Sequence, residues 1–218
     1  MDRMMLLFEI IGTVAFSISG AFVAIRKGMD LLGVLVMGLV TAVGGGVIRD
    51  VVTGSVPPKA FTDPGYAGLA IVVAAIAFVI EWKIKKDKST TSQTFEKILF
   101  LSDSVGLATF TVFGIRCVQE QLGNDNYALL IFVGVITGVG GGVLRDLFAN
   151  TVPSIFRKHV YATASIVGAC SFLLAEKFVG QNTAAVLSLI ITVLIRVLAG
   201  HFQWNLPCIE WEKNKERY

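Results

Sequence analysis

The sequence predicts an all-α polytopic membrane protein with seven transmembrane helices, built as two inverted three-helix repeats followed by a seventh helix. Two observations predict the membrane class: 54% of the 218 residues are hydrophobic while only 16% are charged, and the mean hydropathy is +0.71. This balance is more apolar than one soluble core requires. A third observation, an internal repeat, predicts how the helices are grouped.

Seven apolar runs supply the predicted helices. Each has about 20 residues, which as a helix crosses roughly 30 Å of hydrocarbon. A signal peptide is the alternative for the first run, but Glu9 interrupts that run and no small-x-small cleavage site follows it. In chain order the runs cover residues 4–25, 31–53, 65–82, 98–118, 127–149, 160–179 and 183–200.

The repeat is clearest in two decapeptides, "TAVGGGVIRD" at residues 41–50 and "TGVGGGVLRD" at residues 137–146. Upstream, "EIIGTVAFSISG" from Glu9 aligns with "DSVGLATFTVFG" from Asp103, and downstream Tyr66 aligns with Tyr161 after one gap. Each unit contains three helices. Because three is odd, the second unit enters the membrane from the opposite side, so a pseudo-two-fold axis in the membrane plane relates the units.

The chain therefore divides into a first three-helix repeat (1–88), a second, inverted repeat (89–180), a seventh transmembrane helix (181–202) and a cytoplasmic tail (203–218). Twelve Lys and Arg residues fall in segments on one side of the membrane and four on the other, with Arg49, Arg145 and Arg196 left out as intramembrane. The positive-inside rule then places the N-terminus outside and the C-terminus in the cytoplasm.

Two glycine triplets are the first candidate site. Each glycine costs a helix about 1 kcal/mol relative to alanine, so three adjacent ones favour an unwound turn. Freed backbone groups there need water or protein partners, which predicts a cavity lined by ion-binding carbonyls. Small residues spaced four apart, such as Gly38 and Ala42, instead favour close helix packing. Both interpretations remain open for Gly44, Gly45, Gly46, Gly140, Gly141 and Gly142.

The Arg-Asp pairs Arg49-Asp50 and Arg145-Asp146 follow the triplets. A charge in hydrocarbon costs about 2.5–3.5 kcal/mol, so each pair needs partners. Sequence neighbours point about 100° apart around a helix, so we expect each member to pair elsewhere rather than with its neighbour. They either form interhelical salt bridges, or the carboxylates concentrate cations at pore mouths that the arginines gate.

Three further positions stand out inside the apolar runs. Glu9 and Asp103 are expected near the membrane interface, as favourable acids at the starts of their helices. Phe16 and Phe110 are either hydrophobic constrictions of a pore or ordinary core aromatics. Arg196 in the seventh helix either snorkels to the interface or pairs with an acid.

Several function classes lack a motif. The chain has no GxxxxGK[ST], GxSxG or HExxH pattern, so we expect neither an enzyme nor a nucleotide- or nucleic-acid-binding protein. Cys117, Cys170 and Cys208 are too widely spaced for a disulfide frame or a zinc site, and His159 and His201 are too far apart to bind a metal. No cofactor is expected beyond permeating potassium or sodium ions.

Two three-helix units that each carry GGGVIRD or GGGVLRD followed by Val-Pro, plus a seventh helix, resemble the bacterial branch of the trimeric intracellular cation (TRIC) channel family. This branch is also named after glycine transport. The resemblance implies a homotrimer in the bacterial inner membrane. It also implies an hourglass pore for potassium or other monovalent cations in each protomer, lined by the second and fifth helices and kinked at the two triplets.

Two rival functions remain open. A secondary transporter for a small amino acid such as glycine would hold the carboxylate on the amides of Val47 and Val143 and the ammonium on nearby carbonyls. A membrane scaffold without transport would need the triplets for stability only.

Overall fold

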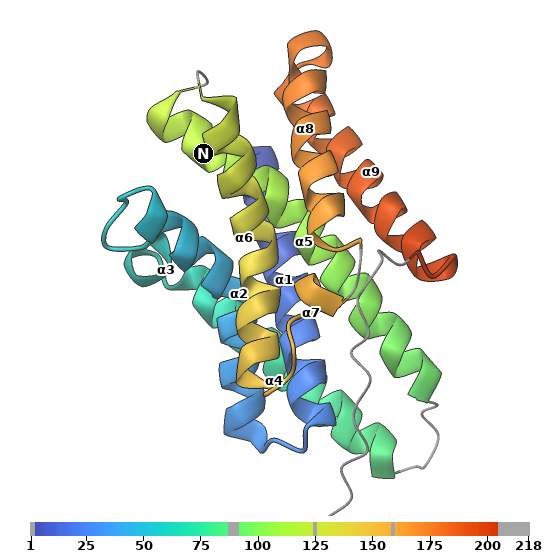
Figure 1. Ribbon diagram of the computed structural model, residues 1–218. Helices are drawn as coiled ribbons and strands as arrows, with labels where there is room; N and C mark the ends of the chain where they lie inside the picture. The colour runs from blue at the N-terminus through green and yellow to red at the C-terminus, as the bar shows by residue number, and fades with distance from the viewer. Residues whose placement is uncertain (1–2, 87–91, 124–125, 158–159, 205–218) are drawn as a thin grey trace, which may run out of the picture.

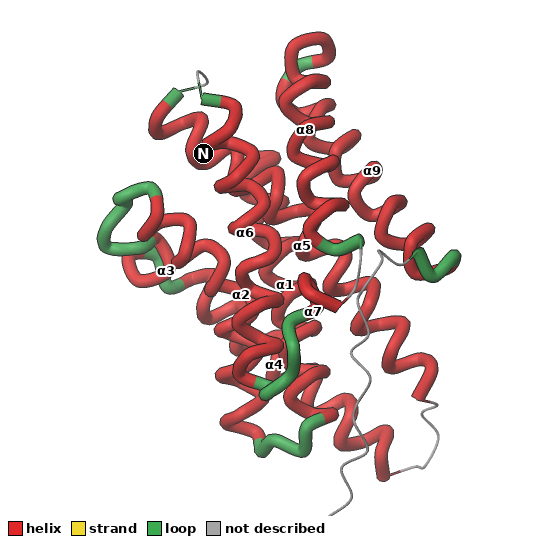
Figure 2. Tube along the Cα trace, viewed as in Figure 1, coloured by secondary structure: helices red, strands yellow, loops and turns green. Residues whose placement is uncertain are grey.

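The computed structural model describes residues 3–86, 92–123, 126–157 and 160–204, and this part of the chain is helical with no strand (Figures 1 and 2). Seven helices are long and apolar enough to cross a membrane, as the sequence predicts. They are α1 (Arg3–Arg26), α2 (Leu31–Val52), α4 (Gly65–Lys86), α5 (Ser92–Leu122), α6 (Tyr127–Phe148), α8 (Ala162–Val179) and α9 (Gln181–His201), with short α3 (Lys59–Thr62) and α7 (Ser154–Arg157) between them.

The helix bounds agree with the apolar runs except at α5. This helix begins at Ser92, although the apolar run begins at about residue 98. Its first turns contain Gln93, Glu96 and Lys97, which are good helix formers that hydropathy alone does not detect. Residues 205–218, which hold Cys208 and most of the predicted tail, and His159 lie outside the described residues. Cys117 and Cys170 are free, as expected.

The helices pack as two interlocked repeats. At the centre α1 packs against α5 and α2 against α6, while α4 covers the first repeat, α8 the second, and α9 lies on α5 and α8 (Figure 1). α1 and α5 run in opposite directions (Figure 1). Corresponding contacts recur: Ser17 Oγ donates to the Ala70 carbonyl at 2.6 Å, and Thr111 Oγ1 lies 2.7 Å from Ser165 Oγ. The repeats are therefore inverted, as predicted.

The glycine triplets lie where α2 and α6 cross. Both helices are continuous through them, so the predicted unwound turn is wrong. A Cβ atom on Gly45 would meet the backbone carbonyl oxygen of Thr137, and one on Gly141 would meet that of Thr41. The two backbones pack directly on each other, and this contact offsets the low helix propensity of glycine. Close packing, the second interpretation, explains these two glycines.

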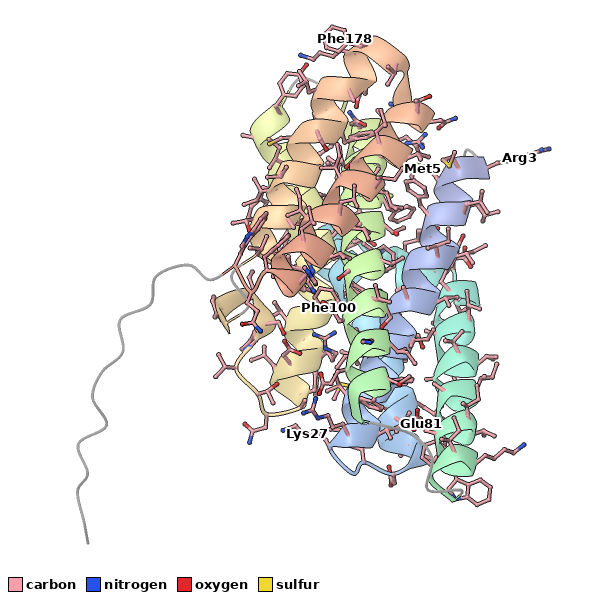
Figure 3. The ribbon with its side chains drawn as sticks, turned by 90° about the vertical axis from the view of Figure 1, so that its right-hand side faces the viewer. Arg3, Met5, Lys27, Glu81, Phe100 and Phe178 are labelled. Atoms are coloured by element: carbon pink, nitrogen blue, oxygen red, sulfur yellow. The ribbon has the colours of Figure 1, made fainter. Side chains whose placement is uncertain are left out.

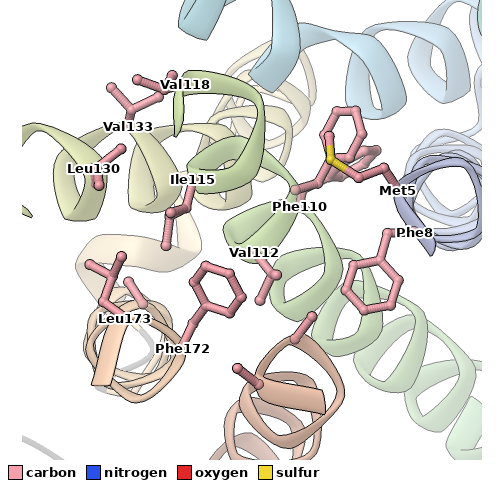
Figure 4. Close-up of a cluster of buried hydrophobic side chains, with 14 of the residues drawn as sticks. Met5, Phe8, Phe110, Val112, Ile115, Val118, Leu130, Val133, Phe172 and Leu173 are labelled. Atoms are coloured by element: carbon pink, nitrogen blue, oxygen red, sulfur yellow. The ribbon is translucent and has the colours of Figure 1, made fainter. Parts of the chain in front are cut away.

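Phe16 and Phe110 form the centre of the bundle. Their ring centroids are 5.4 Å apart, and their side chains are buried. Each ring covers a glycine of the other repeat, since a Cβ on Gly106 would strike Phe16 and one on Gly12 would approach Phe110 at 2.9 Å. From there a hydrophobic cluster extends outward, with side chains from α1, α5, α6 and α8 (Figure 4). Both phenylalanines are core residues.

We expect Gly45→Ala to lower the free energy of unfolding by about 1–3 kcal/mol, because the new methyl group would press on a carbonyl that a continuous helix cannot move aside. Gly68→Ala is the control, since a Cβ at Gly68 meets nothing within 4 Å. It should be neutral or raise stability by up to about 1 kcal/mol. Thermal unfolding of the purified variants in detergent measures both, and equal stability of the two variants would contradict the proposed backbone contact.

Candidate functional site

Two buried polar clusters lie on either side of the glycine crossing. Each forms where an Arg-Asp pair at the end of a central helix meets side chains from the flanking helices. The repeat-one cluster comprises Glu9 of α1, Arg49 and Asp50 of α2, Lys59 of α3 and Tyr66 of α4. The repeat-two cluster comprises Asp103 of α5, Arg145 and Asp146 of α6, Tyr161 before α8 and Arg196 of α9.

In both clusters the neighbouring arginine and aspartate pair with each other. Arg49 Nε donates to Asp50 Oδ1 at 2.8 Å, and Arg145 Nε donates to Asp146 Oδ1 at 2.9 Å. The expectation that sequence neighbours would not pair is therefore wrong. An arginine side chain is long enough to bend along the helix surface and reach the short carboxylate beside it, even though the two Cβ atoms point apart.

The second oxygen of each aspartate holds the chain that follows its helix. Asp50 Oδ2 accepts a hydrogen bond from the Lys59 backbone N–H at 2.8 Å, and Asp146 Oδ2 accepts one from the Ser154 backbone N–H at 2.7 Å. These bonds fix the starts of α3 and α7. Each aspartate therefore connects the glycine helix to the segment that leads into the third helix of its repeat.

Glu9 belongs to a buried ion pair. Lys59 Nζ donates to its two carboxylate oxygens at 2.9 and 2.8 Å, and the Lys59 ammonium also lies 5.1 Å from the Tyr66 ring centroid. The expectation of a helix-start acid is wrong, because α1 begins at Arg3, and Glu9 is only 7% exposed. Sequence analysis missed the role of Lys59, whose short helix is brought over Glu9 only by the fold.

Asp103 is the centre of the repeat-two cluster. It accepts hydrogen bonds from Arg145 Nη1 at 2.7 Å, Arg196 Nη2 at 2.9 Å and the Tyr161 hydroxyl at 3.2 Å. Arg145 Nη1 also donates to Ser19. Asp103 is not the helix-start acid that was expected, because α5 begins at Ser92. Arg196 pairs with an acid, which was one of its two alternatives.

Besides their different acids and the bases Lys59 and Arg196, which each belong to only one cluster, the two clusters differ in what lies against the arginine that follows the glycines. Ser19, which binds Arg145, corresponds in the repeat to Phe113, whose ring centroid lies 5.4 Å from the Arg49 guanidinium carbon. A phenyl ring accepts no conventional hydrogen bond, and Arg49 Nη1 is buried without a partner among the described residues. The repeat-one cluster is therefore incompletely satisfied where the repeat-two cluster is closed.

Arg49 lines a cavity of about 40 Å³ whose lining also includes Gly46, Phe110 and Thr137. This volume holds one or a few water molecules. A larger cavity of about 410 Å³ lies at the other end of the bundle beside Asp146. The two cavities share no lining residue. The repeat-one cavity therefore extends from one end of the bundle toward its centre and ends beside Phe110.

The predicted site residues are brought together only in part. Arg49, Asp50 and Phe110 line the repeat-one cavity together with Gly46. Gly44 faces Leu144, and Gly140 lies against Gly45, so these glycines serve packing. Gly142 lies under the Tyr161 hydroxyl.

Among the described residues no three His, Cys, Asp or Glu side chains are grouped as metal ligands. The amides of Val47 and Val143 lie within continuous helices, which removes the predicted carboxylate site there.

Comparison with known sequences identifies a family match and close relatives. The model of the glycine transporter family matches residues 6–82 and 100–177. A UPF0126 membrane protein of Deinococcus radiodurans is 42% identical over 174 residues, covering 78% of this chain and 76% of the relative. The UPF0126 inner membrane protein YadS of Escherichia coli K12 is 35% identical over 209 residues, covering 94% and 96%.

Solved structures share the fold. A structure from work on conductance through TRIC cation channels is 36% identical, covers 94% of this chain and 97% of its own, and has a TM-score of 0.79. A prokaryotic TRIC channel in 0.5 M KCl is 29% identical with coverage of 94% and 100% and a TM-score of 0.84. The TRIC orthologue of Rhodobacter sphaeroides is 30% identical with coverage of 93% and 100% and a TM-score of 0.83.

We expect Asp103→Asn to destabilise the fold by about 3–5 kcal/mol, because it leaves Arg196 buried without its counter-charge and leaves Arg145 with Asp146 alone. Glu96→Gln is the control, since the Arg26–Glu96 pair is exposed and should change stability by less than about 1 kcal/mol. Thermal unfolding in detergent measures both. A loss of the same size in the two variants would show that the repeat-two cluster is not a structural centre.

Proposed function

Since this chain belongs to the glycine transporter family and shares its fold with TRIC cation channels, we propose that it is a monovalent cation channel with a path inside each protomer. Potassium is the proposed main permeant ion, with sodium as a second. The chain is a multi-pass membrane protein. We further propose a homotrimer with the N-terminus outside and the C-terminus in the cytoplasm, since a matched relative is called trimeric.

One observation carries the proposal: a polar cavity reaches the bundle centre beside an excess of acidic groups. Its lining includes three acids, Glu9, Asp50 and Asp63, against the two bases Arg49 and Lys59. In a low-dielectric surrounding a net negative charge favours entry of a cation over an anion. The arrangement therefore supports a cation path that begins at the repeat-one cluster.

The conformation described corresponds to a closed path. We propose that the packed rings of Phe16 and Phe110 close the path between the two cavities, which share no lining residue, and that the glycine crossing holds α2 against α6. Opening then requires the central helices to move apart. We propose that the helices bend at Gly44, Gly45 and Gly46 and at Gly140, Gly141 and Gly142, because glycine resists bending less than any other residue.

The arginines are the proposed gating groups. Arg49 and Asp50 in one cluster, and Arg145 and Asp146 in the other, neutralise each other in the closed form. Movement of an arginine away from its aspartate would free a carboxylate to hold a cation in the path. The unsatisfied Nη1 of Arg49 makes the repeat-one pair the less constrained of the two.

Recordings from purified protein in planar bilayers test the channel. Under a KCl gradient we expect single-channel currents that reverse near the potassium equilibrium potential. Phe110→Ala should raise the open probability, because it removes half of the ring pair that separates the cavities. Phe178→Ala is the matched control, since Phe178 is 79% exposed (Figure 3). An anion-selective current, or no current from correctly folded protein, would reject the proposal.

A transporter of glycine is the second candidate, and one observation favours it. Arg49, whose Nη1 has no partner among the described residues, lines the same cavity as Glu9. A zwitterion has the complementary pair of charges: its carboxylate would pair with the guanidinium, and its ammonium would take the place of the Lys59 ammonium at Glu9.

Equilibrium binding of radiolabelled glycine distinguishes the two functions. A transporter predicts saturable binding that is lost in Arg49→Gln and retained in Arg26→Gln, whose side chain is exposed. The channel predicts no saturable glycine binding in either variant. Uptake that saturates at low turnover without electrical current would also favour the transporter.

A further inference from the structure

A buried glutamate outside both polar clusters lacks a partner. Glu81 of α4 is 8% exposed, and no hydrogen bond or ion pair joins its carboxylate to another residue in the described part of the chain. It lies at the same end of the bundle as Lys27, with which it makes no ion pair (Figure 3). Its oxygens are not among the fully buried atoms that lack a partner, and Glu81 lines a cavity, so a donor from outside the described chain can reach them.

The second repeat has a glutamate at the corresponding position, and that glutamate has a hydrogen-bond donor. Continuing the alignment of Tyr66 with Tyr161 without a further gap places Glu81 opposite Glu176 of α8. Gln119 Nε2 donates to the two carboxylate oxygens of Glu176 at 3.2 and 3.0 Å. The corresponding carboxylate of the second repeat is therefore satisfied by an N–H donor from α5.

The first repeat has no such donor at the corresponding position. Extending the alignment of Glu9 with Asp103 along the helices places Ile25 of α1 opposite Gln119. The isoleucine side chain has no N–H group. The first repeat therefore has a glutamate at this position but an apolar side chain where the second repeat has its donor. This difference leaves a space rather than a filled core: Ile25 and Glu81 line a cavity of about 190 Å³.

The chemistry of this cavity indicates its ligand. Besides Ile25 and Glu81, the described residues that line it are Gly28, Met29, Phe78 and Trp82, none of which is basic. One carboxylate beside two aromatic rings suits an organic cation. The C-terminal end of α1 adds partial negative charge. No three candidate metal ligands are grouped within the described ranges, which disfavours a metal ion.

We propose that this cavity binds a primary ammonium group, which donates N–H bonds to Glu81 in place of the missing glutamine amide. Trp82 is 63% exposed at the end of a transmembrane helix, a typical position of tryptophan at the membrane interface. The ammonium group therefore comes either from an ethanolamine phospholipid headgroup or from a small free amine. The site is separate from the proposed ion path and does not depend on it.

Native mass spectrometry of the purified chain with added phospholipids tests the lipid source. We expect the ethanolamine headgroup to be retained over the choline headgroup, which has no N–H donor, and over the glycerol headgroup, which has no cation. Glu81→Gln should lower this retention roughly tenfold, the effect of one charged hydrogen bond. Glu120→Gln, at an exposed glutamate at the end of α5, should leave it unchanged.

A second variant separates loss of the site from loss of the fold. Ile25→Gln recreates the donor of the second repeat, so it should raise the unfolding temperature while abolishing retention of the ethanolamine lipid. For the free-amine source, ethanolamine should raise the unfolding temperature of delipidated wild-type protein but not of Glu81→Gln. Retention that is equal for ethanolamine and choline lipids, or unchanged in both variants, together with no response to free ethanolamine, would overturn the proposal.

Discussion

The direct contact between the backbones of α2 and α6 is the constraint on which the rest of the structure depends. Gly45 and Gly141 permit it because neither has a side chain to separate the two helices. Around this point the two repeats are related by their pseudo-two-fold axis. The Arg-Asp pairs follow the triplets within about one helical turn, so the crossing also places the two charge clusters at opposite ends of the bundle centre.

Buried charge follows the same symmetry, but the two ends are not equivalent. In the repeat-two cluster Asp103 accepts hydrogen bonds from Arg145, Arg196 and Tyr161. Arg145, the arginine that follows the glycines, has no nitrogen atom that is buried without a partner in the described part of the chain. In the repeat-one cluster the corresponding Arg49 lies against the Phe113 ring, and its Nη1 is buried without a partner among the described residues. The serine of one repeat supplies a partner to Arg145, whereas the corresponding phenylalanine of the other supplies none to Arg49.

The peripheral helices show the same kind of divergence. Glu81 and Glu176 occupy corresponding positions, yet only Glu176 has its glutamine donor. Comparing the two halves of one chain therefore acts as an internal control. Where both halves agree, as at Ser17 with Ala70 and Thr111 with Ser165, the contact serves the fold. Where they differ at a buried polar group, one half has an unmet hydrogen-bonding requirement that a ligand can satisfy.

The sequence by itself determined the seven membrane helices and the inverted repeat, because hydropathy and internal similarity are properties of the chain and need no knowledge of contacts. Only the tertiary structure decided whether the glycine triplets break or pack their helices, because glycine permits both and the neighbouring helix selects one. It also decided the ion pairs. Arginine reaches its neighbouring aspartate through a flexible side chain, and Lys59 and Arg196 meet Glu9 and Asp103 only after distant segments of the chain have packed together.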